Sequence, residues 1–135
     1  KRQEVFIETK DPKYIWQDRF YLDADLTKFL YFGEYPELLH LYLPIELVDK
    51  WSQAEDQMQA VMETYNLKIF SVSYTEAAGW SFYTANKLQI NLGSDLSFEA
   101  FQKLSLTLKY IFEKNLTPSI IDLRYKDGAA LNYGK

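Results

Sequence analysis

Few side chains in this sequence have the types and spacing that chemistry requires. The single histidine, His40, lies in the apolar run from Leu38 to Tyr42, where a lone histidine is more often a hydrogen-bonded or half-exposed side chain than a catalyst. Asp23 and Asp25 form the best carboxylate cluster, but they occupy a turn, where aspartate is favoured because it hydrogen-bonds to the local backbone. We therefore expect neither a metal site nor acid–base catalysis at these residues.

Asp122 and Arg124 could be mistaken for an acid–base pair, because they project from the same face of one predicted strand. Neighbours in this register more often form a partly exposed ion pair, and we interpret them in that way. The sequence has no cysteine, so thiolate metal sites, cysteine nucleophiles and disulfides are excluded. It also lacks a G-x-S-x-G elbow, a P-loop and a G-x-G-x-x-G motif. We expect neither enzymatic activity nor a cofactor.

Length and composition place the chain among globular proteins, with one domain or with one domain and a fragment of a neighbouring one. It has 135 residues, 47% of them hydrophobic, with only 5 Gly and 4 Pro. Lys and Arg total 15 and Asp and Glu total 19, which gives a net charge of −4 without a cationic cluster. Domains that bind nucleic acid or anionic lipid need such a cluster, so both classes are disfavoured. The 11 Tyr, 9 Phe and 3 Trp favour a high content of sheet.

No segment approaches the roughly 20 apolar residues of a membrane span, and the first residues lack the apolar core of a signal peptide. We expect either a cytosolic protein or a soluble piece of a longer chain. Residues 3–9 (QEVFIET) alternate like a strand with no cap or turn ahead of them, which favours the second interpretation.

Short apolar segments separated by polar turns dominate the first part of the chain and predict small hairpins, with strands in residues 13–16, 20–22 and 26–32. Residues 33–44 contain two prolines that bracket a short apolar run. We interpret this segment as a loop with at most one strand or turn.

Residues 68–92 predict a three-strand meander. The first strand, residues 68–75 (KIFSVSYT), alternates strictly and places three side chains on one side: Phe70, Val72 and Tyr74. Two further strands follow short turns, in residues 80–85 and 88–92.

Two segments have apolar side chains at the spacing that is typical of amphipathic helices. The first spans about residues 45–65, directly after Pro44, and Asn66 can end it. The second ends near Asn115, and it starts at one of three capping residues: Ser94, Asp95 or Ser97. We therefore expect an α+β domain in which two helices cover a bent, mostly antiparallel sheet.

The carboxyl-terminal hairpin is the segment with the strongest local signal. Residues 119–125 (SIIDLRY) and 129–133 (AALNY) are predicted strands, and Asp127-Gly128 readily takes the positive φ values of a type I′ turn. This turn would fix the register, and the expected pairs are Tyr125 with Ala130 and Leu123 with Asn132.

The last strand carries neither Pro nor charge, and we expect it at an open sheet edge, with one row of N–H and C=O groups unpaired. One interpretation is an ordinary terminal edge. The other is a docking site for a partner strand by β-augmentation, in which backbone hydrogen bonds provide affinity and pockets beside Tyr125 or Tyr133 provide selectivity.

Two stretches of the sequence, GWSFYTANKLQINLG (residues 79–93) and IDLRYKDGAALNY (residues 121–133), flank an apolar helix. With their Trp-led strand, L-G ending, D-L-R-Y strand and x-x-G loop, they resemble the β domain of the bacterial cell-division family FtsQ, called DivIB in Gram-positive bacteria. VFIETKDPKYIW (residues 5–16) resembles the end of the family's POTRA domain. The resemblance implies that residues 1–10 are the end of a POTRA-like domain or a linking strand, and residues 11–135 an FtsQ-type β domain.

The resemblance also implies a function, that of a non-enzymatic scaffold of the divisome at the septum. Family members are single-pass proteins of the bacterial inner membrane with this domain in the periplasm, so the membrane anchor is expected outside this fragment. They hold FtsB and FtsL, small coiled-coil membrane proteins, and their last strand receives a strand from FtsB. The partner-binding residues implied by matching positions are Arg124, Tyr125, Gly128, Ala129, Ala130, Leu131, Asn132 and Tyr133. In this role Arg124 is expected to grip an acidic partner residue, and Tyr125 to pack against an apolar one.

Two other interpretations stay open. The first is a small-molecule-binding or enzymatic α+β domain, whose pocket would be lined by Trp16, Tyr31 and His40. The second is an extracytoplasmic assembly domain of another system, because POTRA-linked domains also serve protein secretion.

Overall fold

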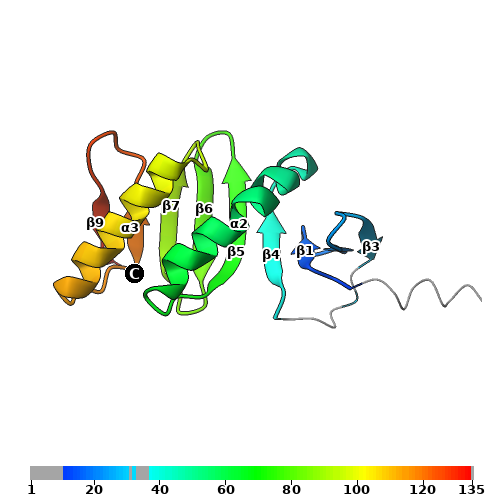
Figure 1. Cartoon of the computed structure of the whole chain (residues 1–135), viewed down its shortest axis with the longest axis horizontal. Helices are drawn as coiled ribbons and strands as arrows, with labels where there is room; N and C mark the ends of the chain where they lie inside the picture. The colour runs from blue at the N-terminus through cyan, green and yellow to red at the C-terminus, as the bar shows by residue number, and fades with distance from the viewer. Residues whose placement is uncertain (1–10, 31, 33–36, 135) are drawn as a thin grey trace, which may run out of the picture.

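The structure is a computed structural model, and it describes residues 11–30, 32 and 37–134. In this part of the chain nine strands form one sheet, in the order β3-β2-β1-β4-β5-β6-β7-β8-β9 (Figure 1). The pairs β1/β4, β4/β5 and β7/β8 are parallel, and the other neighbours are antiparallel. The strand predicted in residues 3–9 lies outside the described residues. The strands are β1 (Tyr14–Trp16), β2 (Phe20–Leu22), β3 (Lys28–Leu30), β4 (Leu39–Tyr42), β5 (Ile69–Thr75), β6 (Gly79–Thr84), β7 (Gln89–Gly93), β8 (Ile120–Asp122) and β9 (Ala130–Asn132).

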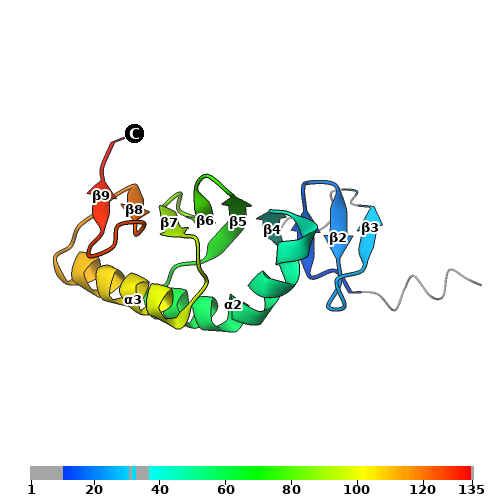
Figure 2. The ribbon, with the colours of Figure 1, turned by 90° about the horizontal axis from the view of Figure 1, so that it is seen from above.

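Both long helices cover the same face of the sheet (Figure 2). The helix α2 (Val48–Glu63) connects β4 to β5, and α3 (Phe98–Glu113) connects β7 to β8. Each helix is therefore the crossover between two neighbouring parallel strands. The predicted α+β class, with an open, mostly antiparallel sheet covered by two helices, is confirmed.

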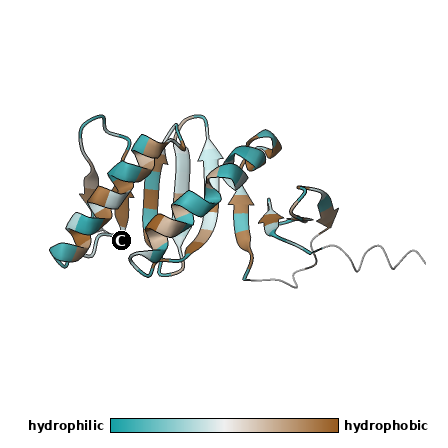
Figure 3. Ribbon diagram, viewed as in Figure 1, coloured by the Kyte–Doolittle hydropathy of each residue, from teal (hydrophilic) through white to brown (hydrophobic). Residues whose placement is uncertain are grey.

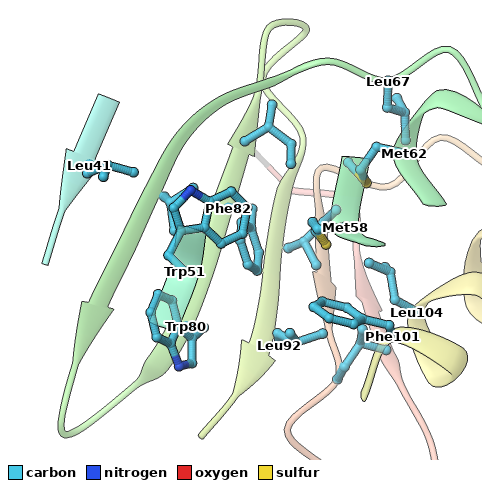
Figure 4. Close-up of a cluster of buried hydrophobic side chains, with 14 of the residues drawn as sticks. Leu41, Trp51, Met58, Met62, Leu67, Trp80, Phe82, Leu92, Phe101 and Leu104 are labelled. Atoms are coloured by element: carbon cyan, nitrogen blue, oxygen red, sulfur yellow. The ribbon is translucent and has the colours of Figure 1, made fainter. Parts of the chain in front are cut away.

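One row of side chains across the sheet forms the floor of the core. Its members pair with one another from strand to strand and are all fully buried: Leu41, Val72, Phe82, Ile90 and Ile121. The helices cover this row with their own buried side chains, which include Trp51, Met58, Met62, Phe101 and Leu104 (Figure 4). Each large side chain buried in this way stabilises the fold by about 1.5–3 kcal/mol. Both helices mix hydrophilic and hydrophobic positions (Figure 3), as packing on one face requires.

Both long helices end in the same arrangement. Asn66 and Asn115 adopt φ values of 59° and 57°. The residues that follow them, Leu67 and Leu116, donate their N–H groups to carbonyl oxygens five residues earlier. This is the Schellman motif, in which a residue in the left-handed conformation lets the chain satisfy the last free carbonyls of the helix. The predicted helix ends at Asn66 and near Asn115 are confirmed.

The first residues of the two long helices differ in part from the prediction. The first helix is predicted from about Ile45, but a 3-10 turn, η1 (Ile45–Leu47), follows Pro44, and the α-helix begins at Val48. Ser97 is the capping residue of α3, because its Oγ accepts a hydrogen bond from the N–H of Ala100 at 3.1 Å.

The strand β4 lies within the segment that the sequence predicts as a loop with at most one strand or turn, residues 33–44. It pairs in parallel with both β1 and β5, so it joins the amino-terminal hairpins to the rest of the sheet. Four residues are too few to reveal a periodicity, and the partners of β4 are distant in sequence. The prediction therefore allowed a strand in this segment, but it did not indicate that the strand lies between β1 and β5 in the sheet.

The strand β5 departs from the predicted alternation. Phe70 and Val72 were expected on one side, but Phe70 is 48% exposed and Val72 is fully buried. The register of β5 against β6 shifts between Ile69 and Ser71, and such a bulge inserts an extra residue that changes which side chains face the core. Phe70 stacks on His40 instead, with 4.8 Å between the ring centroids.

Candidate functional site

The strand β9 is the last in the order of the sheet. Its only strand neighbour among the described residues is β8, so its other side is an open edge. Edge strands present a row of unpaired backbone N–H and C=O groups. The predicted open carboxyl-terminal edge is therefore present, although β9 covers Ala130–Asn132 and is shorter than the strand predicted in residues 129–133.

The register of the last hairpin differs from the predicted one by three residues. The expected pairs, Tyr125 with Ala130 and Leu123 with Asn132, are replaced by Asp122 with Ala130 and Ile120 with Asn132. Neither Asp127 nor Gly128 adopts the positive φ that a type I′ turn requires. The predicted two-residue turn is therefore wrong, and residues 123–129 form a longer connection.

Contacts of the connection explain why it leaves the β8/β9 ladder early. The N–H of Leu123 donates to the carbonyl oxygen of Asn91 in β7 at 2.8 Å. Lys103 of α3 donates from Nζ to the carbonyl oxygen of Leu123 at 3.2 Å and to that of Tyr125. These bonds hold the start of the connection against β7 and α3. The sequence does not predict this role of Lys103, and its only signal is a lysine beside the apolar stripe of the helix.

Asp122 and Arg124 form an ion pair with two hydrogen bonds. The Nε of Arg124 donates to Oδ1 of Asp122 at 2.9 Å, and Nη2 donates to Oδ2 at 2.8 Å. The side chain of Asp122 is 10% exposed, whereas that of Arg124 is 43% exposed. The side-chain hydrogen bonds from Arg124 are the main reason why the pKa of the Asp122 carboxyl is lowered, and burial opposes them. The interpretation of these residues as a partly exposed ion pair is confirmed.

Seven of the eight residues of the expected partner site lie in the connection and in β9, and Tyr133 follows β9 directly. Tyr125 and Tyr133 expose 57% and 55% of their surface. A Cβ placed on Gly128 would have no atom within 4 Å, so this part of the connection is open to solvent. Leu131 is half-buried and packs against the core. The structure therefore brings the eight residues to one edge of the molecule, where most of them are accessible.

A hollow of about 250 Å³ lies beside Arg124. Its lining combines the end of β7, the start of α3 and the residues after β8, and includes Gly93, Ser97, Lys103 and Leu123.

The side chains expected to line an alternative ligand pocket are used in packing. The Nε1 of Trp16 donates to the carbonyl oxygen of Leu43 at 2.7 Å. The ring of His40 stacks on Phe70 and on Tyr42. Tyr31, the third residue of that prediction, lies outside the described residues. Trp16 and His40 thus connect elements of the sheet.

The carboxylate cluster considered as a candidate site has a structural role. Asp23 accepts hydrogen bonds from the N–H groups of Asp25 and Thr27 at 2.9 and 3.0 Å, which confirms its predicted role in a turn. Within the described ranges, His, Cys, Asp and Glu side chains do not gather in groups that could hold a metal ion. In the same ranges no helix is long and apolar enough to cross a membrane.

Comparisons with known proteins indicate a family for this chain. A family model described as cell division protein FtsQ/DivIB, C-terminal, matches residues 15–124, from within β1 to just after β8, so β9 lies beyond the match. The cell division protein FtsQ of Aliivibrio fischeri (strain ATCC 700601 / ES114) is 28% identical over 88 residues, which cover 65% of this chain and 33% of that protein. The chain thus spans about a third of the length of this relative. Because the family match covers well over half of its residues, the chain belongs to the FtsQ/DivIB family of cell-division proteins.

Proposed function

We propose that this chain is a non-enzymatic scaffold domain of the division machinery that recruits FtsB-like and FtsL-like coiled-coil membrane proteins by β-strand addition. Family membership carries the role in cell division. The open side of β9 is the observation that supports strand addition. In this proposal an extended segment of the FtsB-like partner pairs with β9 and becomes the next strand of the sheet.

The backbone of β9 has the groups that such pairing needs. The carbonyl oxygen of Asn132 accepts a hydrogen bond from the N–H of Ser119 at 2.8 Å, so it faces β8. Along a strand, successive residues direct their backbone polar groups to alternate sides. The N–H and C=O of Leu131 therefore face the open edge, where they can bond to a partner strand.

Side chains next to β9 supply selectivity in this proposal. Arg124 has further N–H donors beyond the two that bind Asp122, so it can bind a partner carboxylate while Asp122 keeps it oriented. Tyr125 is exposed and offers an aromatic ring to an apolar partner residue. Strand addition supplies affinity through the backbone, and these two residues would distinguish one extended segment from another.

The proposal places the domain in the periplasm, with a single membrane-spanning anchor outside this fragment. Family membership supports this location. Residues 1–10 would be the end of a POTRA-like domain or a linking strand, and residues 11–135 the FtsQ-type β domain.

Leu131→Pro tests strand addition, because proline removes one N–H from the open edge and is tolerated at edge positions. We expect this variant to abolish binding of the extracytoplasmic part of the FtsB-like partner in calorimetry. Leu131→Ala is the matched control, since it loses the side chain but keeps the N–H, and it should still bind. Urea unfolding of both variants shows whether the domain stays folded.

Amide exchange supplies a second measurement on the unchanged protein. The amide of Leu131 should gain protection when the partner is added, because it then donates to the partner strand. Full binding by the folded Leu131→Pro variant, or an unchanged exchange rate at Leu131, would show that the partner does not pair with β9.

A further inference from the structure

The side of α3 that faces away from the sheet carries large apolar side chains. No element in the described part of the chain lies over this side (Figure 2). Phe98, Leu106 and Tyr110 expose 60%, 67% and 54% of their surface. With the exposed Gln102 they follow one another at intervals of four residues and form one ridge, the α3 ridge, which is about 18 Å long. A contiguous exposed apolar ridge is typical of an interaction surface.

A hollow of about 240 Å³ lies beside the α3 ridge, between α2 and α3. Phe98, Gln102 and Leu106 of the ridge line it on one side, and Gln57 and Val61 of α2 line it on the other. The described residues that line this hollow carry no charge. A partner surface would therefore meet an apolar ridge and an uncharged hollow, which it can cover without removing a charged group from water.

Two opposite charges flank the α3 ridge. Glu99 lies near its first residue and Lys109 near its last, and both side chains are exposed. Neither has an ion-pair partner among the residues that the structure describes. Each is five residues from Leu104, a fully buried residue that marks the midpoint of the ridge from the opposite side of the helix. The ridge therefore has one acidic and one basic flank at equal distances from its midpoint.

We propose that the α3 ridge binds a second copy of this chain, whose own α3 packs antiparallel on it about a two-fold axis through the midpoint. In a two-fold interface, residue i contacts residue j of the second copy, and j contacts i. Residues at equal distances from the midpoint then face one another, in three pairs: Phe98 with Tyr110, Gln102 with Leu106, and Glu99 with Lys109. The two flanks thus form two ion pairs, whereas parallel helices would place Glu99 against Glu99. This charge complementarity selects a second copy in the antiparallel orientation.

The geometry predicts a weak dimer. Helices that pack through ridges of this spacing cross at about 50°, so the contact is confined to their middle turns. The crossing also separates the helix ends, which keeps Glu113 away from Asp95 of the second copy. The contact is then smaller than the roughly 800 Å² per partner of a stable complex, and we expect a dissociation constant of about 0.1 mM. None of the ridge residues belongs to β9, so the inference is independent of strand addition.

Sedimentation equilibrium at concentrations up to about 1 mM tests the dimer and its apolar centre. The average mass should rise from that of one chain toward that of two. Leu106→Ser should weaken the dimer about tenfold, because each copy loses an apolar contact at the middle of the interface. Leu30→Ser is the matched control, a similarly exposed leucine on β3, and it should dimerise like the unchanged chain. A mass that stays at that of one chain, or equal dimerisation of the two variants, would overturn the proposal.

A charge exchange tests the antiparallel arrangement. Lys109→Glu places two carboxylates against each other at both flanks and should weaken the dimer about tenfold. Adding Glu99→Lys to the same chain restores opposite charges at both flanks, so the double variant should dimerise within about twofold of the unchanged chain. Thermal unfolding shows whether both variants stay folded. A folded double variant that dimerises no more tightly than Lys109→Glu would contradict the pairing of these two residues.

NMR spectra recorded over the same range of concentrations locate the interface. The amides of Phe98, Gln102 and Leu106 should show the largest shift changes as the dimer forms, and those of β9 should change little. Largest changes in β9 would mean that two copies associate through their open sheet edges, and this result would overturn the assignment to α3.

Discussion

Arg124 and Asp122 are joined by two hydrogen bonds in the free domain, so the arginine expected to meet a partner is already held in place. Asp122 also pairs with Ala130 of β9, which connects the ion pair to the open edge. A side chain that is oriented before binding loses less conformational freedom when a partner arrives. Under the proposed function, the pair would hold Arg124 ready for a partner carboxylate next to β9, the strand that would receive the partner.

Arg124→Gln should raise the pKa of the Asp122 carboxyl toward its ordinary value, because the hydrogen bonds from Arg124 are the main cause of the lowered pKa. A lowered pKa in the folded state stabilises the fold above the unfolded pKa of about 4, and this contribution is lost as the pH falls through the folded value. NMR titration of the Asp122 carboxyl carbon measures the change. Lys126→Gln, in the same connection, is the control, and an unchanged pKa in Arg124→Gln would contradict the role of the ion pair.

Tyr14→Phe should remove part of the alkaline pH dependence of stability. The hydroxyl of Tyr14 donates to Glu55 of α2, and burial, followed by this hydrogen bond, raises the pKa of Tyr14 well above its ordinary value. As the pH rises, the hydroxyl of Tyr14 therefore loses its proton in the unfolded chain at a lower pH than in the folded domain. Its contribution to the free energy of unfolding is complete below about pH 10 and is lost as the pH rises further. We expect the variant to be less stable by about 1 kcal/mol at neutral pH.

Urea unfolding at neutral and alkaline pH measures this effect. Tyr83→Phe is the control, because its exposed hydroxyl donates only to the side chain of Gln89 on the neighbouring strand. If Tyr14→Phe and the unchanged protein lost stability equally above about pH 10, Tyr14 would not be the group responsible.

Gly79→Ala should destabilise the domain by about 3 kcal/mol. Gly79 adopts a φ of 77°, and a Cβ at this position would lie 2.4 Å from the carbonyl oxygen of Gly93. Gly128→Ala is the matched control, since its Cβ would meet no atom within 4 Å, and we expect a change within about 0.5 kcal/mol. Urea denaturation measures both, and equal stability of the two variants would contradict the close approach of Gly79 to Gly93.

Ser97→Ala should cost about 1 kcal/mol of folding stability, because it removes the acceptor for the N–H of Ala100 at the start of α3. Ser94→Ala is the control, since Ser94 was an alternative capping candidate but does not cap the helix. Thermal unfolding of the two variants distinguishes them. A larger loss in Ser94→Ala would mean that α3 starts earlier in solution.

The sequence by itself determined those features whose causes are local. Asn66 and Asn115 end the helices because asparagine tolerates the left-handed conformation, and Asp23 forms its turn with backbone groups only a few residues away. The β6 and β7 strands follow from their own patterns, and the motifs around them were sufficient to indicate the FtsQ/DivIB family. The eight residues of the candidate site also form one nearly continuous stretch, so their grouping needed no knowledge of distant contacts.

Only the tertiary structure decided where β4 lies and how the last hairpin pairs. The strand β4 joins β1 and β5, and neither contact leaves a periodic signal in a segment of four residues. The local preference of Asp127-Gly128 for a tight turn is weaker than two hydrogen bonds of Leu123 to distant elements. Its N–H donates to the carbonyl oxygen of Asn91, and its carbonyl oxygen accepts from Nζ of Lys103. Long-range hydrogen bonds therefore override turn propensity here. They satisfy the N–H and C=O of Leu123, which would otherwise have had to find partners within a tight hairpin.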